Sequence, residues 1–351
     1  MASEALLHQI GLNVDALISC DLLSYGVIGP LFERTRERQG GGPLSLQGAR
    51  LLAERLNDGG SALIATGLIL PGHHPYGETD GPLGAAVLAR ALAFGLERPV
   101  AVACEAELAG LLAALLRRAG LQVVAPEALA AGAGHRPAAA VLAIPTGEAE
   151  AAAWAEHTLE GLDVRAVVSI ERNGANAEGR YCMVNGTDLS DGIGKAVPLM
   201  TACRRRGIAS IGIGDRGNEL GFGPVTDIVA AILPRGALAA DTTPSSLVLP
   251  ATVSNWGAYG LVACLAALLE QPELLHSAEL ELALAETAVA AGGVDGMSGR
   301  AEPGADGIGA AVHAALATLL QEAYRARSAR NPSPFSTPLI EGREGAATGT
   351  T

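Results

Sequence analysis

Lysine is nearly absent from this chain: Lys195 is the only lysine among 24 basic residues, and the formal net charge is −13. Nucleic-acid binding depends on clustered Lys and Arg side chains that neutralise phosphates, so this charge balance argues against a nucleic-acid partner. Aromatic residues are also scarce, at 3% of the chain, whereas hydrophobic residues reach 49%. The core must therefore be built from Ala, Leu, Val and Ile.

The five cysteines lie far apart and include no CxxC pair, so neither a disulfide framework nor a zinc site is indicated. Apolar runs are broken by Gly, Pro or charge before about 18 residues, which argues against a membrane span. The N-terminus has neither the basic start and apolar core of a signal peptide nor the Arg-rich pattern of a transit peptide. We expect a reduced, cytoplasmic protein without a membrane partner. A homo-oligomer is compatible with the sequence.

The apolar pattern divides the chain into three parts. Residues 1–60 show helical spacing and are predicted to form a helical N-terminal segment packed on the main domain. Residues 61–327 are predicted to form an α/β domain. Residues 328–351 have no apolar period and are predicted to be a disordered tail.

Short apolar strands alternate with helices from residue 61 onward. Strands are predicted at 62–66, 100–104, 121–124, 138–144, 166–170, 208–213 and 247–253, with a weaker candidate at 68–70. A spacing of about 30 residues leaves room for crossover helices, which implies parallel pairing. Continuous apolar strands are typical of a sheet covered on both faces. We therefore expect a mainly parallel sheet with helices on both faces, a Rossmann-like three-layer fold.

The glycine-rich stretch 210–223, SIGIGDRGNELGFG, follows one of these strands. It contains a G-x-G-x-x-G match, but the carboxylate of Asp215 would repel the pyrophosphate that such a turn binds. Asp215 and Glu219 are four residues apart and would face the same way on a helical turn, which suits a cation or an ammonium group. We predict that both are catalytic and that Asn218 contacts the substrate. The alternative is a tight turn in which Asp215 or Asn218 caps the next helix.

A second polar loop follows the first strand. Thr66 and Gly67 end that strand and are predicted to contact substrate, and Glu78 and Asp80 precede the next helix. Carboxylates at a helix N-terminus are favoured without any catalytic role. Two in one loop also suit acid–base chemistry, and we predict that both are catalytic. The neighbouring histidines at 73 and 74 are expected to be solvated.

The two loops together also lead us to expect a metal site. Asp80, Asp215 and Glu219 are its predicted ligands, and the possible cofactor is a divalent cation, Mg²⁺ or Mn²⁺. The sequence has no nucleophile elbow, no H-E-x-x-H and no P-loop pattern. The strand ends therefore favour acid–base or metal-assisted chemistry on a small charged substrate over covalent catalysis.

Two further strand ends carry polar side chains that we predict to contact substrate. Glu171 and Arg172 are predicted to contact substrate, with the Arg172 guanidinium holding a carboxylate, or alternatively to form a structural ion pair with each other. Tyr181 follows in the same loop. Ser254 and Asn255 end the last strand and could bind a ligand or cap the next helix.

Four expectations concern structure alone. Ser45 is predicted to cap the third N-terminal helix. Asp295-Gly296 and Asp306-Gly307 are predicted to form turns, and a role as site residues is the second alternative. Lys195 is predicted to start a surface helix.

Six motifs at the predicted strand ends form a recognisable set: T-G at 66–67, G-E-T-D-G-P at 77–82, I-E-R at 170–172, G-R-Y at 179–181, G-I-G-D-x-G-N-E-x-G-x-G at 212–223 and S-N-W-G-A-Y at 254–259. In this order the set resembles the D-glutamate cyclase family, and within it the C-terminal domain of the animal mitochondrial members. The resemblance extends from about residue 66 to about residue 259.

The resemblance implies a lyase that dehydrates D-glutamate to 5-oxo-D-proline. It places Asp215 or Glu219 at the substrate ammonium, Arg172 at a substrate carboxylate, Glu78 and Asp80 as acids or metal ligands, and Asn218 and Asn255 as positioning groups. The expected partner is a small acidic amino acid. Two other functions stay open: a non-catalytic binding module for such a ligand, and a metal-dependent hydrolase or transferase acting on another carboxylated metabolite.

Overall fold

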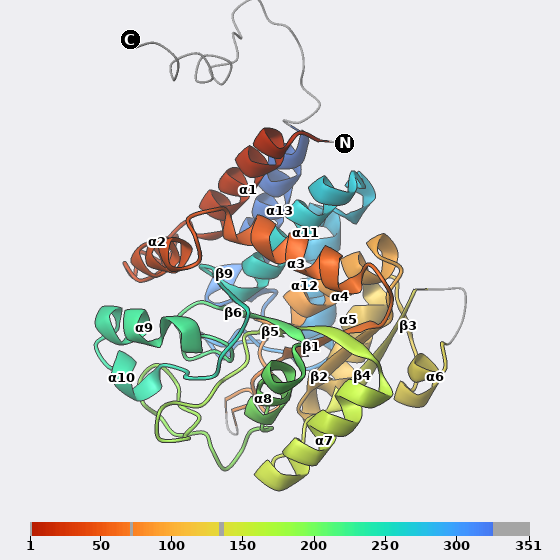
Figure 1. Cartoon of the computed structure of the whole chain (residues 1–351). Coiled ribbons are helices and arrows are strands. Elements are labelled where there is room, and N and C mark those ends of the chain that lie inside the picture. The colour runs from red at the N-terminus through yellow and green to blue at the C-terminus, as the bar shows by residue number, and fades with distance from the viewer. Residues whose placement is uncertain (1, 71–72, 133–136, 326–351) are drawn as a thin grey trace, which may run out of the picture.

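The computed structural model describes residues 2–70, 73–132 and 137–325. A seven-stranded parallel sheet forms its centre, in the order β3-β4-β2-β1-β5-β6-β7 (Figure 1). Its strands are β1 (Ser61–Thr66), β2 (Val100–Cys104), β3 (Gln122–Val123), β4 (Ala138–Ala143), β5 (Val164–Ile170), β6 (Ala209–Gly214) and β7 (Leu247–Pro250). The predicted parallel α/β fold is confirmed. The candidate strand at 68–70 forms only a single bridge, between Leu70 and His74.

Helices cover both faces of the sheet (Figure 1). One face carries α3 (Leu44–Leu56), α4 (Pro82–Gly95), α5 (Ala109–Arg118) and α11 (Ser254–Leu269), and outside them lie α1 (Glu4–Ile18), α12 (Ala278–Ala290) and α13 (Ala310–Arg325). The other face carries α6 (Pro126–Ala130), α7 (Glu148–Gly161) and α8 (Val197–Arg206). Near β7 lie α2 (Ile28–Arg38), α9 (Thr226–Ile232) and α10 (Gly236–Ala239). Short 3-10 helices occur at Ala106–Leu108, Gly223–Val225 and Pro272–Leu274.

The strands are apolar throughout because both sides of each are buried. In β1, Ala62 and Ile64 join the core beneath α4 and α11, whereas Leu63 and Ala65 join the core beneath α7 and α8. This alternation follows from the two-residue period of a strand. It explains why the sequence shows short continuous apolar runs rather than alternating ones.

The N-terminal helices share the main core, because side chains of α1 and α3 pack against α11. Ser45 does not cap α3 as expected, since the helix begins one residue earlier, at Leu44. The cap comes from Asp15 of α1, whose carboxylate accepts hydrogen bonds from the N–H groups of Leu44 (2.7 Å) and Ser45 (3.0 Å). A carboxylate from another helix thus satisfies donors that the first turn leaves unpaired.

The remaining differences lie outside the central sheet. The glycine-rich stretch after α12 contains a small hairpin, β8 (Gly304–Ala305) and β9 (Ile308–Gly309), that the sequence did not predict. The predicted tail, 328–351, lies outside the described residues. None of the helices within the described ranges is both long and apolar enough to cross a membrane.

Candidate active site

A cavity lined by several of the predicted site residues lies at the carboxyl edge of the sheet, where the strand order reverses. The chain passes from β1 to β2 on one side, whereas the other neighbour of β1 is β5, followed by β6 and β7. In parallel α/β sheets the loops diverge at such a point and leave a crevice that binds ligands. A cavity of about 440 Å³ occupies it, lined by the loops after β1, β5 and β6 and by residues between α1 and α2.

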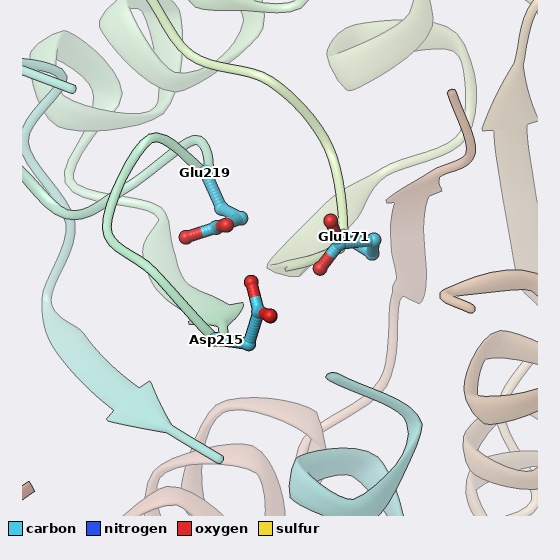
Figure 2. Close-up of side chains that lie close together, drawn as sticks. All are labelled: Glu171, Asp215 and Glu219. Atoms are coloured by element: carbon cyan, nitrogen blue, oxygen red, sulfur yellow. The ribbon is translucent and has the colours of Figure 1, made fainter. Parts of the chain in front are cut away.

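Three carboxylates converge in this cavity. Glu171 directly follows β5, Asp215 directly follows β6, and Glu219 lies four residues further along. One oxygen of each lies within 4.8 Å of the other two, and Figure 2 shows the three side chains pointing into one shared space. The structure therefore brings Asp215 and Glu219 together, and places Glu171 beside them.

The backbone at the two strand ends holds this arrangement. Glu171 has a φ of 46°, in the left-handed region that residues other than glycine rarely occupy. Its N–H donates to the carbonyl of Ile213 (3.2 Å), which ties it to β6. Asn173 and Glu219 form an isolated antiparallel bridge, and Glu219 Oε2 accepts a hydrogen bond from the N–H of Gly217 (2.6 Å). Non-glycine backbone in the left-handed region costs about 1–3 kcal/mol and concentrates at functional sites.

Three more acidic side chains line the cavity: Asp21, Glu78 and Asp306. Burial raises the pKa of Glu78 well above its usual value, and the charge of Asp80 raises it further. Burial and Asp215 raise the pKa of Asp306 to about 8. Asp306 is therefore predominantly protonated at neutral pH, and the environment of Glu78 likewise favours its protonated form. Asp306 is both the predicted turn residue, at the tip of the β8–β9 hairpin, and a cavity residue.

The clustered carboxylates also favour proton binding by one another. Loss of contact with water raises the pKa of Glu171 well above its usual range, and the nearby Asp215 raises it further. The same two causes, in the same order, raise the pKa of Glu219. Such mutual shifts are typical of sites in which carboxylates take different protonation states.

Arg216 is the only Arg or Lys among the described residues that line the cavity. Its Nη2 lies 3.2 Å from Asp215 Oδ2 and 3.6 Å from Asp306 Oδ2, and its pKa is raised chiefly by the charge of Asp215. Its guanidinium carbon lies 5.8 Å from the ring centroid of Tyr25. No role was predicted for Arg216 from the sequence, although it lies within the glycine-rich stretch 210–223.

His74 also lines the cavity, although the sequence predicted a solvated side chain at this position. Its side chain is buried rather than solvated, at 3% exposure. Neither ring nitrogen has a hydrogen-bond partner within the described part of the chain. Burial, and to a lesser extent the neighbouring His73, lowers the pKa of His74 to about 4. The imidazole is therefore neutral at pH 7.

Asp80 and Asn255 lie beside the cavity. The side chain of Asp80 caps α11, which contains Asn255, and the side chain of Asn255 caps α4, which follows Asp80. The Asp80 carboxylate accepts hydrogen bonds from the N–H groups of Ser254 (3.0 Å) and Asn255 (2.9 Å) at the start of α11. The Asn255 side-chain oxygen accepts from the N–H groups of Gly81 (2.9 Å) and Gly84 (2.7 Å) at the start of α4. Neither is among the described residues lining the cavity. Their positions support capping rather than the predicted metal and substrate contacts.

Arg172 is buried beneath the cavity, at 1% exposure. Its Nη1 donates to Glu105 Oε2 (2.6 Å) and to the carbonyl of Gly67 (2.9 Å), and its Nη2 donates to the carbonyl of Gly194. The structural ion pair left open by the sequence is therefore present, but with Glu105 instead of Glu171. Gly67 adopts a φ of +91°, and the Leu108 side chain fills the space where a Cβ would stand. The predicted substrate contacts of Arg172 and Gly67 have no support from these positions.

The remaining predicted contacts are also buried. Thr66 is fully buried at the end of β1, and Tyr181 lies in a small apolar cluster with the Lys195 ammonium 4.4 Å from its ring centroid. Lys195 is thus only 6% exposed, contrary to the expected surface position. Ser254 donates a hydrogen bond from its hydroxyl to Glu171, which makes it a positioning group for the carboxylate cluster. Of the predicted site residues, the cavity lining includes Glu78, Glu171, Asp215, Asn218 and Glu219.

The fold and the cavity define an α/β protein with an acidic cavity at its topological switch point. A family model described as D-glutamate cyclase-like, C-terminal, matches residues 30–321, and the chain belongs to this family. A human protein named D-glutamate cyclase, mitochondrial, is 30% identical over 210 residues, which make up 58% of this chain and 32% of the human protein. The aligned part therefore spans about a third of the human protein.

Proposed function

We propose that the cavity binds D-glutamate and catalyses its intramolecular dehydration to 5-oxo-D-proline. Membership of the D-glutamate cyclase-like family and the name of the human relative support this reaction. The structural observation that carries the proposal is the convergence of three carboxylates beside one guanidinium, that of Arg216, in a single cavity. This arrangement offers an acidic region for an ammonium group and one cation for a carboxylate.

The reaction sets three tasks for the protein. The substrate ammonium must lose a proton so that its nitrogen can attack the side-chain carboxyl carbon. One oxygen of that carboxyl must leave as water, taking up both protons that the nitrogen loses, while the lactam nitrogen keeps the third. The chain must also hold the substrate folded so that nitrogen and carbon approach, because positioning supplies much of the rate of a ring closure.

The cavity residues suit these tasks. Asp215 or Glu219 is the proposed base at the ammonium. Glu78, whose pKa is raised chiefly by burial, is the proposed acid that gives a proton to the departing oxygen. Arg216 takes over the carboxylate-binding role that the sequence suggested for Arg172, because its guanidinium faces the cavity. Asn218 lines the same cavity and is the proposed polar contact to the substrate.

Turnover and binding measured on the full chain test this proposal. The assay follows 5-oxoproline formation from D-glutamate, with L-glutamate as a stereochemical control, and calorimetry measures binding of D-glutamate and of 5-oxoproline. We expect D-glutamate to bind and to be converted. Binding without conversion would instead support a non-catalytic binding module. Neither binding nor conversion would favour a metal-dependent hydrolase or transferase acting on another carboxylated metabolite.

The setting that we propose for this activity is the cytoplasm. All five cysteines are free thiols in the structure, and four of them are buried, which suits a reducing compartment. The human relative is named as mitochondrial, so localisation of the tagged full-length protein is the decisive check.

A further inference from the structure

The charge of the cavity does not match the proposed substrate. Glutamate carries two carboxylates and one ammonium. Apart from Asp306, which holds a proton at neutral pH, five acidic side chains and a single Arg line the cavity among the described residues. Like charges that approach in a partly desolvated cavity repel strongly. Arg216 is already shared between Asp215 and Asp306, so it offsets only part of this excess. A further positive charge would reconcile the cavity with a dicarboxylate.

The geometry of Glu171, Asp215 and Glu219 suits such a charge. Their nearest oxygens all lie within 4.8 Å of one another. Hard divalent cations bind oxygens at about 2.0–2.6 Å, so two oxygens on opposite sides of one ion are about 4–5 Å apart. One ion could therefore contact all three carboxylates with little movement. Figure 2 shows the shared space between the three side chains.

Unsatisfied oxygens in the same cavity give a second indication, and that of Glu78 is independent of the cluster. Asp215 is 6% exposed, and its Oδ1 is buried with no hydrogen-bond partner in the described ranges. Glu78, which is not one of the three clustered residues, is 8% exposed and has a buried, unpartnered Oε1. Buried polar atoms nearly always have a partner, so oxygens left without one point to a missing ligand. A carboxylate oxygen accepts a cation as readily as it accepts a hydrogen-bond donor.

We propose that Glu171, Asp215 and Glu219 bind one hard divalent cation of the Mg²⁺ or Mn²⁺ class. This ligand set differs from the one expected from the sequence in one residue, because Glu171 replaces Asp80. The Asp80 carboxylate instead accepts hydrogen bonds from the first N–H groups of α11. The inference goes beyond the proposed reaction, because the ion binds the free protein. A cation held by one oxygen of each carboxylate would accept a substrate carboxylate beside Arg216 and would offset the excess of acidic side chains. The second oxygen of Asp215 or Glu219 would stay available as the base at the ammonium.

Binding of Mn²⁺ to the chelator-treated full chain tests the site directly. Electron paramagnetic resonance counts the bound ions, and calorimetry gives the affinity and the competition by Mg²⁺ and Ca²⁺. We expect one saturable site per chain. Glu171→Gln and Asp215→Asn should each weaken Mn²⁺ binding at least about tenfold, because each removes one charged ligand. Glu127→Gln and Asp191→Asn, which change exposed carboxylates outside the cavity, are the matched controls and should bind like the unaltered protein.

Thermal unfolding, measured for each variant with and without Mn²⁺, separates the loss of ion binding from poor folding of a variant. Mn²⁺ should raise the unfolding temperature of the unaltered protein and of both controls, because a ligand that binds only the folded state stabilises it. It should have little effect on either cluster variant. Absence of saturable binding to the unaltered protein, or equal binding by all variants, would overturn the proposal. Turnover of D-glutamate in excess chelator, together with absence of saturable Mn²⁺ binding, would reject the ion while leaving the proposed reaction standing. Mn²⁺ binding without turnover would do the opposite.

Discussion

Two groups of buried carboxylates lie close together in this fold and differ in their hydrogen bonding. Asp241 accepts from three backbone N–H groups and one hydroxyl, and Asp80 accepts from the start of α11. In the cavity, by contrast, Asp215 and Glu78 each have a buried oxygen with no partner among the described residues. Burial of a polar group without a partner costs stability. The hydrogen bonds of the first group hold the loops around the cavity together. The unpartnered oxygens of the second group support the proposal that these carboxylates bind a ligand.

The largest loss of stability should follow from breaking the ion pair beneath the cavity. Arg172→Met leaves the Glu105 carboxylate buried and unpaired, and should lower the free energy of unfolding by about 3–5 kcal/mol, measured by urea denaturation. Combining it with Glu105→Gln removes the unpaired charge and should recover part of the loss. A single variant as stable as the unaltered protein would contradict the structural role assigned to this pair.

Asp241→Ala should be the next most damaging change. It leaves the N–H groups of Gly221, Phe222 and Thr243 without their acceptor, and should cost about 3 kcal/mol of unfolding free energy. Asp241→Asn retains one acceptor oxygen and should cost less. If neither change affected stability, hydrogen bonding would not distinguish the structural carboxylates from those in the cavity.

The pH dependence of stability tests a carboxyl group of the cavity, that of Asp306. Because the pKa of Asp306 is about 8 in the folded protein and about 4 when unfolded, the folded state holds a proton that the unfolded chain releases. The free energy of unfolding should therefore fall as pH rises from about 4 to about 8, by up to about 1.4 kcal/mol per pH unit from this residue.

Asp306→Asn is the variant that isolates this effect. Asparagine also tolerates the left-handed backbone at this turn, where φ is 55°, so the hairpin should persist. In metal-free buffer the variant should show a shallower decline of stability with pH than the unaltered protein, measured by chemical denaturation at several pH values. Identical slopes would show that Asp306 does not hold a proton in the folded state.

The architecture was largely predictable from the sequence because local signals agree with it. The apolar pattern placed β2 at its observed bounds, and the spacing of strands implied parallel pairing. The reversal of strand order between β1 and β5, which creates the crevice, depends on tertiary packing and leaves no local signal. Polar residues at strand ends did indicate the loops that line the cavity, including Asp215 and Glu219.

The partners of individual site residues were not predictable, because they lie far away in the chain. Arg172 pairs with Glu105, 67 residues earlier, and Asp80 caps a helix that begins 174 residues later. A side chain at a strand end can point into the crevice or beneath it, and the sequence does not distinguish the two directions. Tyr25 was missed because the segment between α1 and α2 reaches the cavity only through packing of the N-terminal helices.

Asp215→Asn tests the central claim most directly, because it should have the smallest effect on stability and a large effect on activity. The change keeps the shape of the side chain and removes a charge from a crowded acidic cavity, so the unfolding temperature should be unchanged or slightly raised. Conversion of D-glutamate to 5-oxoproline should fall by at least about 100-fold, in keeping with the loss of a catalytic base. Asp191→Asn should leave both properties unaltered. A folded Asp215→Asn variant that turns over D-glutamate at the unaltered rate would contradict the account.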